Sequence, residues 1–180
     1  MQRIAKFEKV SFEQYLKDFS ETFDVDLVGV KKDINMEIIH DIYDRITLPK
    51  RSTKGSAGYD FVTPIDINLK PNQSIKIPTG IRVRMREDYV LKCYPRSGLG
   101  FKFRLQLNNT VGIIDSDYFY SNNEGHIFAK ITNDTNEYKM VSINAGDGFM
   151  QGIFVQYGIT EDDEADGIRN GGFGSTDKKQ

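Results

Sequence analysis

The fold is indicated first by residues 75–85, which read Ile75-Lys76-Ile77-Pro78-Thr79-Gly80-Ile81-Arg82-Val83-Arg84-Met85. Apolar and polar residues alternate on both sides of the Pro-Thr-Gly segment. Successive side chains of a strand point to opposite faces, so this alternation predicts two half-buried strands separated by a turn. The pattern is clearest in residues 101–107, where Lys102, Arg104 and Gln106 alternate with apolar neighbours. We therefore predict a strand there as well.

The period of two continues over most of the chain after residue 57. Further strand patterns cover residues 125–133, 138–143 and 149–157, and clusters of Gly, Pro, Asn and Asp separate them. Many short strands at this spacing are typical of an antiparallel β-sandwich or jelly roll. The sequence thus predicts an all-β domain over residues 47–160.

Residues 11–46 show a helical period instead. Ser11 and Gln14 fit a capping box. One apolar face follows, made of Phe12, Tyr15, Leu16, Phe19 and Phe23. A second helical pattern contains Met36, Ile39, Tyr43 and Ile46 and ends before Pro49. We expect residues 1–46 to form an N-terminal helical extension packed on the core, with an oligomer or partner contact as the alternative.

Composition narrows the classes of function. The formal net charge of −2 gives no broad basic surface, so direct binding of nucleic acid is not expected. The single cysteine, Cys93, excludes an intrachain disulfide framework and a thiolate zinc cluster, and two histidines argue against a His-rich metal site. We find no apolar run long enough for a signal peptide or a membrane span, so we expect a cytoplasmic protein without membrane association.

Residues 94–102 have the composition of a phosphate-binding loop. Arg96 and Ser97 can donate hydrogen bonds to phosphate oxygens, and Gly98 lets an oxyanion approach the backbone closely. An ordinary turn between two strands would explain the same composition.

Residues 109–118 carry two carboxylates, Asp115 and Asp117. Residues two apart lie on one side of a strand, or they fan out at the tip of a hairpin. One carboxylate could accept a proton from water, and the pair could bind a metal ion. A hairpin turn with solvated aspartates is the alternative without function.

Residues 161–180 are expected to form a flexible C-terminal tail. An acidic run over residues 161–166 favours a solvated loop. Beyond Arg169, the Gly-rich residues 171–176 offer backbone and hydroxyl donors that can wrap a polyphosphate. Phe173 lies among them, and its ring could stack on a nucleobase.

Five segments resemble, in order, the motifs of the homotrimeric all-β dUTPase family of bacterial or phage type. They are residues 57–61, 95–102, 109–118, 146–151 and 171–176. The resemblance implies a jelly-roll dUTPase-like fold and a Mg²⁺-dependent dUTP diphosphatase that limits uracil incorporation into DNA. Water would attack the α-phosphorus in line and release dUMP and pyrophosphate. The active sites would be shared between subunits of the trimer.

The resemblance also implies roles for single residues. Asp115 would activate the attacking water, and Tyr118 would pack under the deoxyribose and leave no room for a 2′-hydroxyl. The uracil edge would be read by Asn109 and by the backbone of Gly112, Ile113 and Ile114.

The remaining roles concern the phosphates. Arg96, Ser97 and Gly98 would hold them, with Gln151 near the α-phosphate. Phe173 would close over the uracil, while Arg169 and the tail residues Gly174, Ser175 and Thr176 would reach the β- and γ-phosphates. Asp60 would contact Mg²⁺ only through water, because the triphosphate and waters bind most of the ion.

Three features depart from the family pattern. Residues 119–124 separate Tyr118 from Gly125 and resemble an insertion. Arg169 lies one position closer to Phe173 than the family arginine does, and Asp177 stands where the family has glycine.

Two alternative functions stay open. One is a dCTP deaminase relative, which would need a glutamate where this chain has Asp115. The other is a regulatory role in which residues 1–46 or 119–124 bind a repressor protein.

Overall fold

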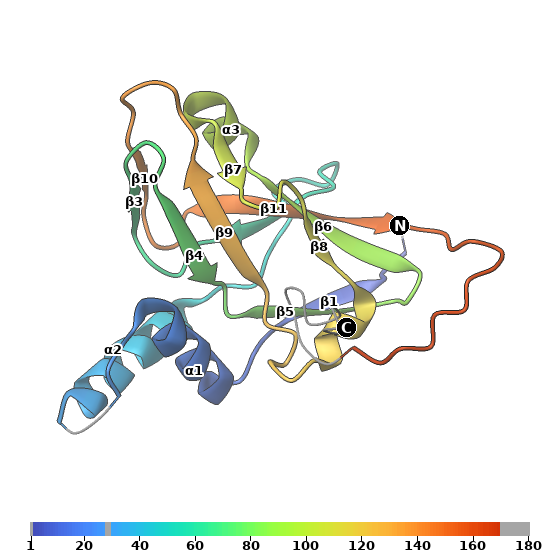
Figure 1. Cartoon of the computed structure of the whole chain (residues 1–180), viewed down its shortest axis with the longest axis horizontal. Coiled ribbons are helices and arrows are strands. Elements are labelled where there is room, and N and C mark those ends of the chain that lie inside the picture. The colour runs from blue at the N-terminus through green and yellow to red at the C-terminus, as the bar shows by residue number, and fades with distance from the viewer. Residues whose placement is uncertain (1, 28–29, 170–180) are drawn as a thin grey trace, which may run out of the picture.

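The computed structural model describes residues 2–27 and 30–169, and their main body is an antiparallel β structure (Figure 1). The strands are β1 (Ala5–Lys9), β2 (Tyr59–Val62), β3 (Ile67–Leu69), β4 (Ser74–Pro78), β5 (Ile81–Met85), β6 (Tyr89–Pro95), β7 (Leu105–Leu107), β8 (Gly112–Ile114), β9 (Phe128–Asn133), β10 (Val141–Ile143) and β11 (Gly148–Gln156). The helices are α1 (Phe12–Phe23), α2 (Val30–Arg45), α3 (Ser97–Phe103) and the 3₁₀ turn η1 (Ser116–Tyr120). The predicted all-β, jelly-roll-like class is confirmed.

The two larger sheets have the strand orders β2-β11-β6-β8 and β4-β9-β7, and β1 pairs with β5 and β3 with β10. The alternating segment over residues 75–85 forms most of β4 and all of β5. They pair with different partners, because β4 lies against β9 and β5 against β1. Gly80 between them has a φ of 72°, a conformation that side chains disfavour. The turn thus carries the chain from one sheet to another.

One hydrophobic cluster joins the two larger sheets. Ile77 and Ile131 enter it from the three-stranded sheet, and Leu91 and Phe149 from the four-stranded sheet. Each is almost fully buried, and burying a side chain of this size stabilises the fold by about 1.5–3 kcal/mol. This shared core fixes the positions of β6, β8 and β9, which form the pocket described below.

The prediction of a strand over residues 101–107 is wrong for its first half. Residues 97–103 form α3, and only Leu105–Leu107 is a strand. Leu99 and Phe103 stand four residues apart, so a helix directs both toward the core, while Phe101 points outward and is 94% exposed. Arg104 closes the helix in the left-handed region with a φ of 51°. The helix also replaces the loop expected over residues 94–102.

Helices α1 and α2 are present as predicted, and the N-terminus of α1 is capped at Ser11. The Ser11 hydroxyl accepts a hydrogen bond from the Gln14 N–H at 3.1 Å. In a capping box the Gln14 side chain would also accept from the Ser11 N–H. Here the Gln14 side chain donates to Asp18 instead, and the Ser11 N–H donates to Glu124 at 2.7 Å.

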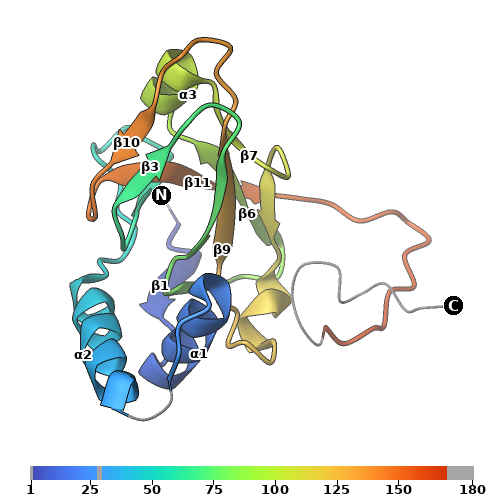
Figure 2. The ribbon, with the colours of Figure 1, turned by 60° about the vertical axis from the view of Figure 1, so that its left-hand side comes forward.

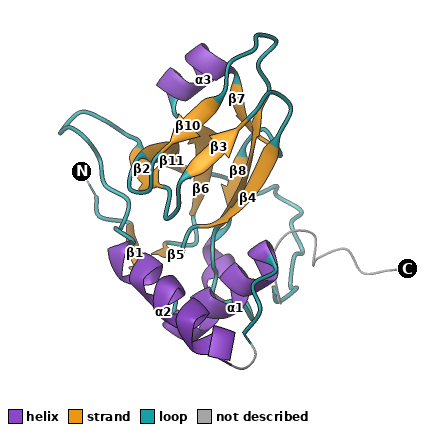
Figure 3. Ribbon diagram, turned by 90° about the vertical axis from the view of Figure 1, so that its left-hand side faces the viewer, coloured by secondary structure: helices purple, strands orange, loops and turns teal. Residues whose placement is uncertain are grey.

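The helical pair is inserted between two strands of the β body rather than preceding it. β1 pairs with β5, so residues 5–9 belong to the sheet region. The chain leaves the β body after β1 and returns to it before β2, and both points lie beside Gly80. The Val10 N–H donates to the Gly80 carbonyl at 3.0 Å, and the Ile46 side chain packs against the same glycine. Figures 2 and 3 show α1 and α2 side by side at one end of the body and α3 at the other. None of the helices in the described residues is long and apolar enough to cross a membrane.

Candidate active site

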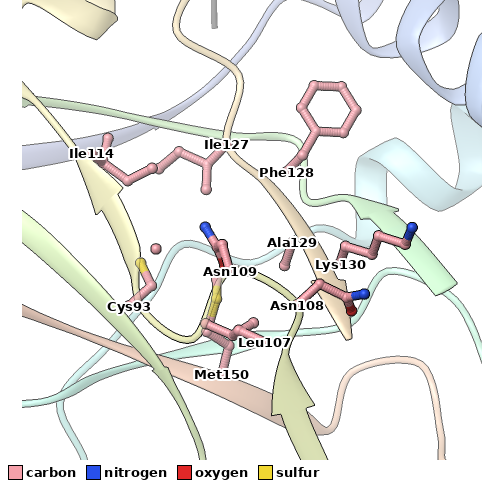
Figure 4. A pocket seen from close by; sticks show the side chains of 11 residues that line it. Cys93, Leu107, Asn108, Asn109, Ile114, Ile127, Phe128, Ala129, Lys130 and Met150 are labelled. Carbon is pink, nitrogen blue, oxygen red and sulfur yellow. The ribbon is translucent and has the colours of Figure 1, made fainter. Parts of the chain in front are cut away.

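A pocket of about 280 Å³ lies between the β7–β8 hairpin, β6 and β9, and we call it the hairpin pocket. Its apolar lining consists of Cys93, Leu107, Ile114, Ile127, Phe128, Ala129 and Met150. Asn108, Asn109, Gly112 and Lys130 complete it. Figure 4 shows the Asn109 amide projecting toward the middle of the pocket from the hairpin tip. An apolar slot with one projecting amide suits a flat ligand that has hydrogen-bonding groups on its edge.

The hairpin geometry explains why Asn109 and Gly112 face the pocket. Thr110, next to Asn109, has a φ of 65°, so the chain turns sharply after Asn109. Gly112 pairs with Cys93, and a side chain at Gly112 would come within 3.1 Å of the Cys93 Cβ. Ile114 lines the pocket, whereas the Ile113 side chain is 50% exposed and is not part of the lining.

A second cavity of about 370 Å³, the Arg96 cleft, is lined by Arg96, Ser97, Gly98, Leu99, Ser142, Ile143, Asp147 and Gly148. The three predicted phosphate ligands of this loop therefore share one cleft. A side chain at Gly98 would meet open space, whereas one at Gly148 would lie 2.5 Å from Nη1 of Arg96. Because Gly148 has no Cβ, the Arg96 guanidinium can lie against this residue.

Gln151 and Asp60 lie beside this cleft. They are paired residues of neighbouring strands, and the Gln151 amide donates to the Pro95 carbonyl at 3.5 Å. The Asp60 carboxylate forms an ion pair with Arg96 at 3.4 Å and accepts from Ser52 at 2.8 Å. Asp60 is thus already occupied by protein donors.

The described residues contain no cluster of three or more His, Cys, Asp or Glu side chains that could enclose a metal ion. Mg²⁺ commonly keeps several waters and binds through one or two carboxylates together with substrate phosphates. The donor set of this chain therefore fits an ion that is held by phosphate oxygens and water, with the protein at a distance.

Asp115 directly follows the pocket residue Ile114 and precedes η1, and Asp117 lies in the first turn of η1. Both carboxylates bind Arg169. The Asp115 Oδ2 lies 2.5 Å from Nη2 and the Asp117 Oδ1 lies 3.0 Å from Nε. Figure 1 shows the long arm after β11 looping outward and returning toward η1. In this arrangement the Arg169 guanidinium neutralises the predicted catalytic carboxylate.

Tyr118 is 4% exposed and is not one of the residues that line the hairpin pocket. Its hydroxyl donates to the His126 carbonyl at 2.7 Å and accepts from the Asn123 amide at 2.8 Å. Burial raises the pKa of Tyr118, and the charge of Asp18 acts in the same direction, so the phenol stays neutral near pH 7. The ring therefore supports the back of the pocket region from within the core.

Four predicted site residues, Phe173, Gly174, Ser175 and Thr176, lie outside the described residues, as does Asp177. Three residues that line the hairpin pocket were not predicted as site residues: Cys93, Phe128 and Met150. The sequence feature that marks these three residues is the alternation of apolar and polar residues in β6, β9 and β11. This alternation predicts buried positions, but it does not distinguish a pocket wall from the core.

An antiparallel β body, an apolar pocket with one amide, and a separate arginine-lined cleft define a protein for a small ligand with a flat part and an anionic part. The family model for dUTPase matches residues 44–177. The chain belongs to the dUTPase family.

Individual relatives agree with this assignment. The deoxyuridine 5′-triphosphate nucleotidohydrolase of Lactococcus lactis subsp. lactis is 41% identical over 134 residues, which cover 73% of this chain and 88% of the relative. The crystal structure of the Streptococcus mutans dUTPase is 37% identical with a TM-score of 0.56, covering 63% of this chain and 88% of that one. A Staphylococcus bacteriophage 80alpha dUTPase with dUPNHPP is 27% identical with a TM-score of 0.52, covering 72% and 91%.

Proposed function

We propose that the protein is a dUTP diphosphatase that hydrolyses dUTP to dUMP and pyrophosphate. The observation that carries the proposal is the placement of Asp115. It follows Ile114, a wall residue of the hairpin pocket into which the Asn109 amide projects. A nucleoside whose base fills this pocket would have its deoxyribose beside the end of β8, where the Asp115 carboxylate follows, near the 3′-hydroxyl, and can act as a base. The L. lactis relative carries the corresponding name.

The proposed chemistry assigns a task to each group. The base edge of uracil binds Asn109 and the backbone of residues 112–114. Asp115 takes a proton from the water that attacks the α-phosphorus, and the bond to the β-phosphate oxygen breaks. Arg96 and the donors of Ser97 stabilise the charge that develops on the phosphates. Gln151 lies beside the same cleft and supports the α-phosphate.

Mg²⁺ belongs to the proposal, bound by the phosphate oxygens. When bound, it would offset charge on the leaving pyrophosphate. Asp60 would contact its water shell through the acceptor sites that Arg96 and Ser52 leave open. Arg169 would leave Asp115 when it turns to the γ-phosphate.

We also propose a homotrimer with shared active sites, acting in the cytoplasm. Support comes from the two cavities of one chain, because the hairpin pocket and the Arg96 cleft have no lining residue in common. A neighbouring copy would bring the two halves together. Light scattering at micromolar concentration should give three times the chain mass of 20.6 kDa. A monomer would contradict the shared site.

A nucleotide panel tests the activity. Pyrophosphate release should be fast with dUTP and Mg²⁺ and negligible with dTTP, dCTP and UTP, and chelation of Mg²⁺ should abolish it. Equal rates with dTTP would contradict the uracil assignment. Ammonia release from dCTP would indicate the deaminase alternative instead.

A second proposed role is regulatory binding of a repressor protein. The N-terminus of helix α1 adjoins residues 119–124, since its N-cap Ser11 binds Glu124. The phage 80alpha structure belongs to work that describes phage dUTPases as controlling transfer of virulence genes. Affinity capture with the full chain and with a variant in which residues 119–124 are replaced by a short turn tests this role. Equal recovery of the same protein from both would remove this surface from consideration.

A further inference from the structure

The inserted helix α1 reaches the interior beside the hairpin pocket through a buried pair. The Asp18 Oδ2 lies 2.5 Å from Nδ1 of His126, whose side chain is fully buried. The other ring nitrogen, Nε2, accepts a hydrogen bond from the Gly80 N–H at 2.7 Å. Because Nε2 accepts, the ring carries its proton on Nδ1 and donates it to Asp18. Both nitrogens are thus bonded, and the orientation of the ring is fixed.

His126 connects this pair to the pocket wall. The next two residues, Ile127 and Phe128, both line the hairpin pocket. The His126 and Phe128 rings are 4.5 Å apart between centroids. The His126 carbonyl accepts the hydroxyl of Tyr118. A shift of His126 would therefore move two pocket residues and the support of Tyr118 together.

A second contact from α1 holds the other end of the same turn. Glu124 accepts from both the N–H and the hydroxyl of Ser11, at 2.7 and 2.6 Å. The neighbouring Asn123 donates to the Tyr118 hydroxyl at 2.8 Å. The turn over residues 123–126 is thus fixed to the cap and to the second turn of the helix, while its other side binds Tyr118.

We propose that Asp18 and His126 are positioning residues that set the shape of the nucleoside pocket and the place of Tyr118, the residue expected under the deoxyribose, and so the affinity for a deoxynucleotide and the rejection of the ribonucleotide. The inference rests on the proposed function, since it assumes that the hairpin pocket takes the nucleoside. Burying polar groups is seldom the most stable way to fill a core, but a pair whose ring nitrogens are both hydrogen-bonded specifies a single arrangement. Helix α1 supplies that arrangement here.

The test compares kcat and KM for dUTP, and kcat/KM for UTP measured in long incubations at high enzyme concentration, among five proteins. They are the wild type, Asp18→Ala, Asp18→Asn, His126→Gln and the control Glu21→Ala, which removes an exposed carboxylate of the same helix. The decisive readout is the ratio of kcat/KM for dUTP to that for UTP. This ratio does not depend on the fraction of enzyme that is folded, so a destabilised variant stays informative.

Asp18→Ala should raise the KM for dUTP about tenfold and lower the selectivity ratio about tenfold, with kcat changed less than about threefold, because small misplacements of a binding wall weaken binding strongly. Asp18→Asn keeps an acceptor for Nδ1 and should show a smaller drop in the same direction. His126→Gln can donate to Asp18 and accept from Gly80, so it should keep most of the selectivity. Glu21→Ala should match the wild type.

An unchanged selectivity ratio in Asp18→Ala would overturn the inference and leave the pair a purely structural one. A drop of equal size in Glu21→Ala would overturn it too, since the effect would then belong to the helix in general. If the wild type released no pyrophosphate from dUTP, the proposed function itself would fail, which is a distinguishable result.

Discussion

Replacing Gly148 by alanine should disable the Arg96 cleft without unfolding the protein. The new Cβ would lie 2.5 Å from Nη1, 3.0 Å from Cδ and 3.2 Å from Cζ of Arg96. Ordinary contacts begin at 3.4 Å, so the guanidinium must move by about 1 Å. Arg96 is partly exposed and can swing outward, so the strain is relieved at the expense of the phosphate contact.

A misplacement of about 1 Å in a substrate-positioning group can lower the rate by about a hundredfold, or about 2.7 kcal/mol of transition-state stabilisation. We therefore expect kcat/KM for dUTP to fall by about 10- to 100-fold in Gly148→Ala. The melting temperature should change by no more than about 4 °C, which corresponds to about 1 kcal/mol or less. Pyrophosphate release and differential scanning fluorimetry measure the two quantities.

Gly100→Ala is the matched control, because a Cβ there meets nothing within 4 Å and α3 gains a better helix former. It should keep wild-type activity and be slightly more stable. Wild-type kcat/KM in Gly148→Ala would refute the reasoning, provided that Arg96→Ala is inactive. The reasoning would also be refuted if the activity of Gly148→Ala fell only in proportion to its fraction of folded protein.

Three further predictions concern the base, the thiol and the cap. Asp115→Asn should lower kcat for dUTP by about 10²- to 10³-fold with an unchanged melting temperature, because an amide cannot accept the proton; a wild-type kcat would reject Asp115 as the base. Burial raises the pKa of Cys93 to about 12, above its ordinary value of 9, so the folded thiol stays protonated as pH rises past 9. The alkylation rate of the native protein at pH 8 should therefore be at least about a thousandfold lower than in urea, and this rate should keep rising with pH above pH 9. Mass spectrometry measures the alkylated fraction over time. A rate that levels off at pH 9 would contradict the burial of the thiol. Ser11→Ala removes a cap and the hydroxyl bond to Glu124, and urea titration should show a loss of about 1–2 kcal/mol; no loss would mean that the cap is dispensable.

The sequence predicted the β body well because its strands carry their own signal. Residues 75–85 alternate without interruption, and the structure has two strands there. Asn109, Gly112 and Ile114 were selected from the motif resemblance, and the hairpin brings them to one pocket.

Other features depend on contacts that no local pattern contains. Residues 101–107 alternate like a strand, but the spacing of Leu99 and Phe103 also suits a helix, and the core selects the helix. The Asp18–His126 pair joins residues 108 positions apart. Neither side chain showed a motif, so only the fold could bring them together.

The meeting of Val10 and Ile46 at Gly80 makes the helical pair a replaceable module. The entropy of closing a loop grows only with the logarithm of its length, so an insert whose ends already adjoin adds little closure entropy, whatever its size, provided that it covers the core that Tyr15 and Phe19 now bury. A short bridge between these two points would preserve the register of β1 with β5, and a longer or different insert would do the same. What changes with the module is the set of contacts that it makes with the body: the Asp18 bond to His126, the Ser11 bonds to Glu124, and the buried Tyr15 and Phe19 rings. Variation at this position in the chain can therefore retune the pocket while the β body stays the same.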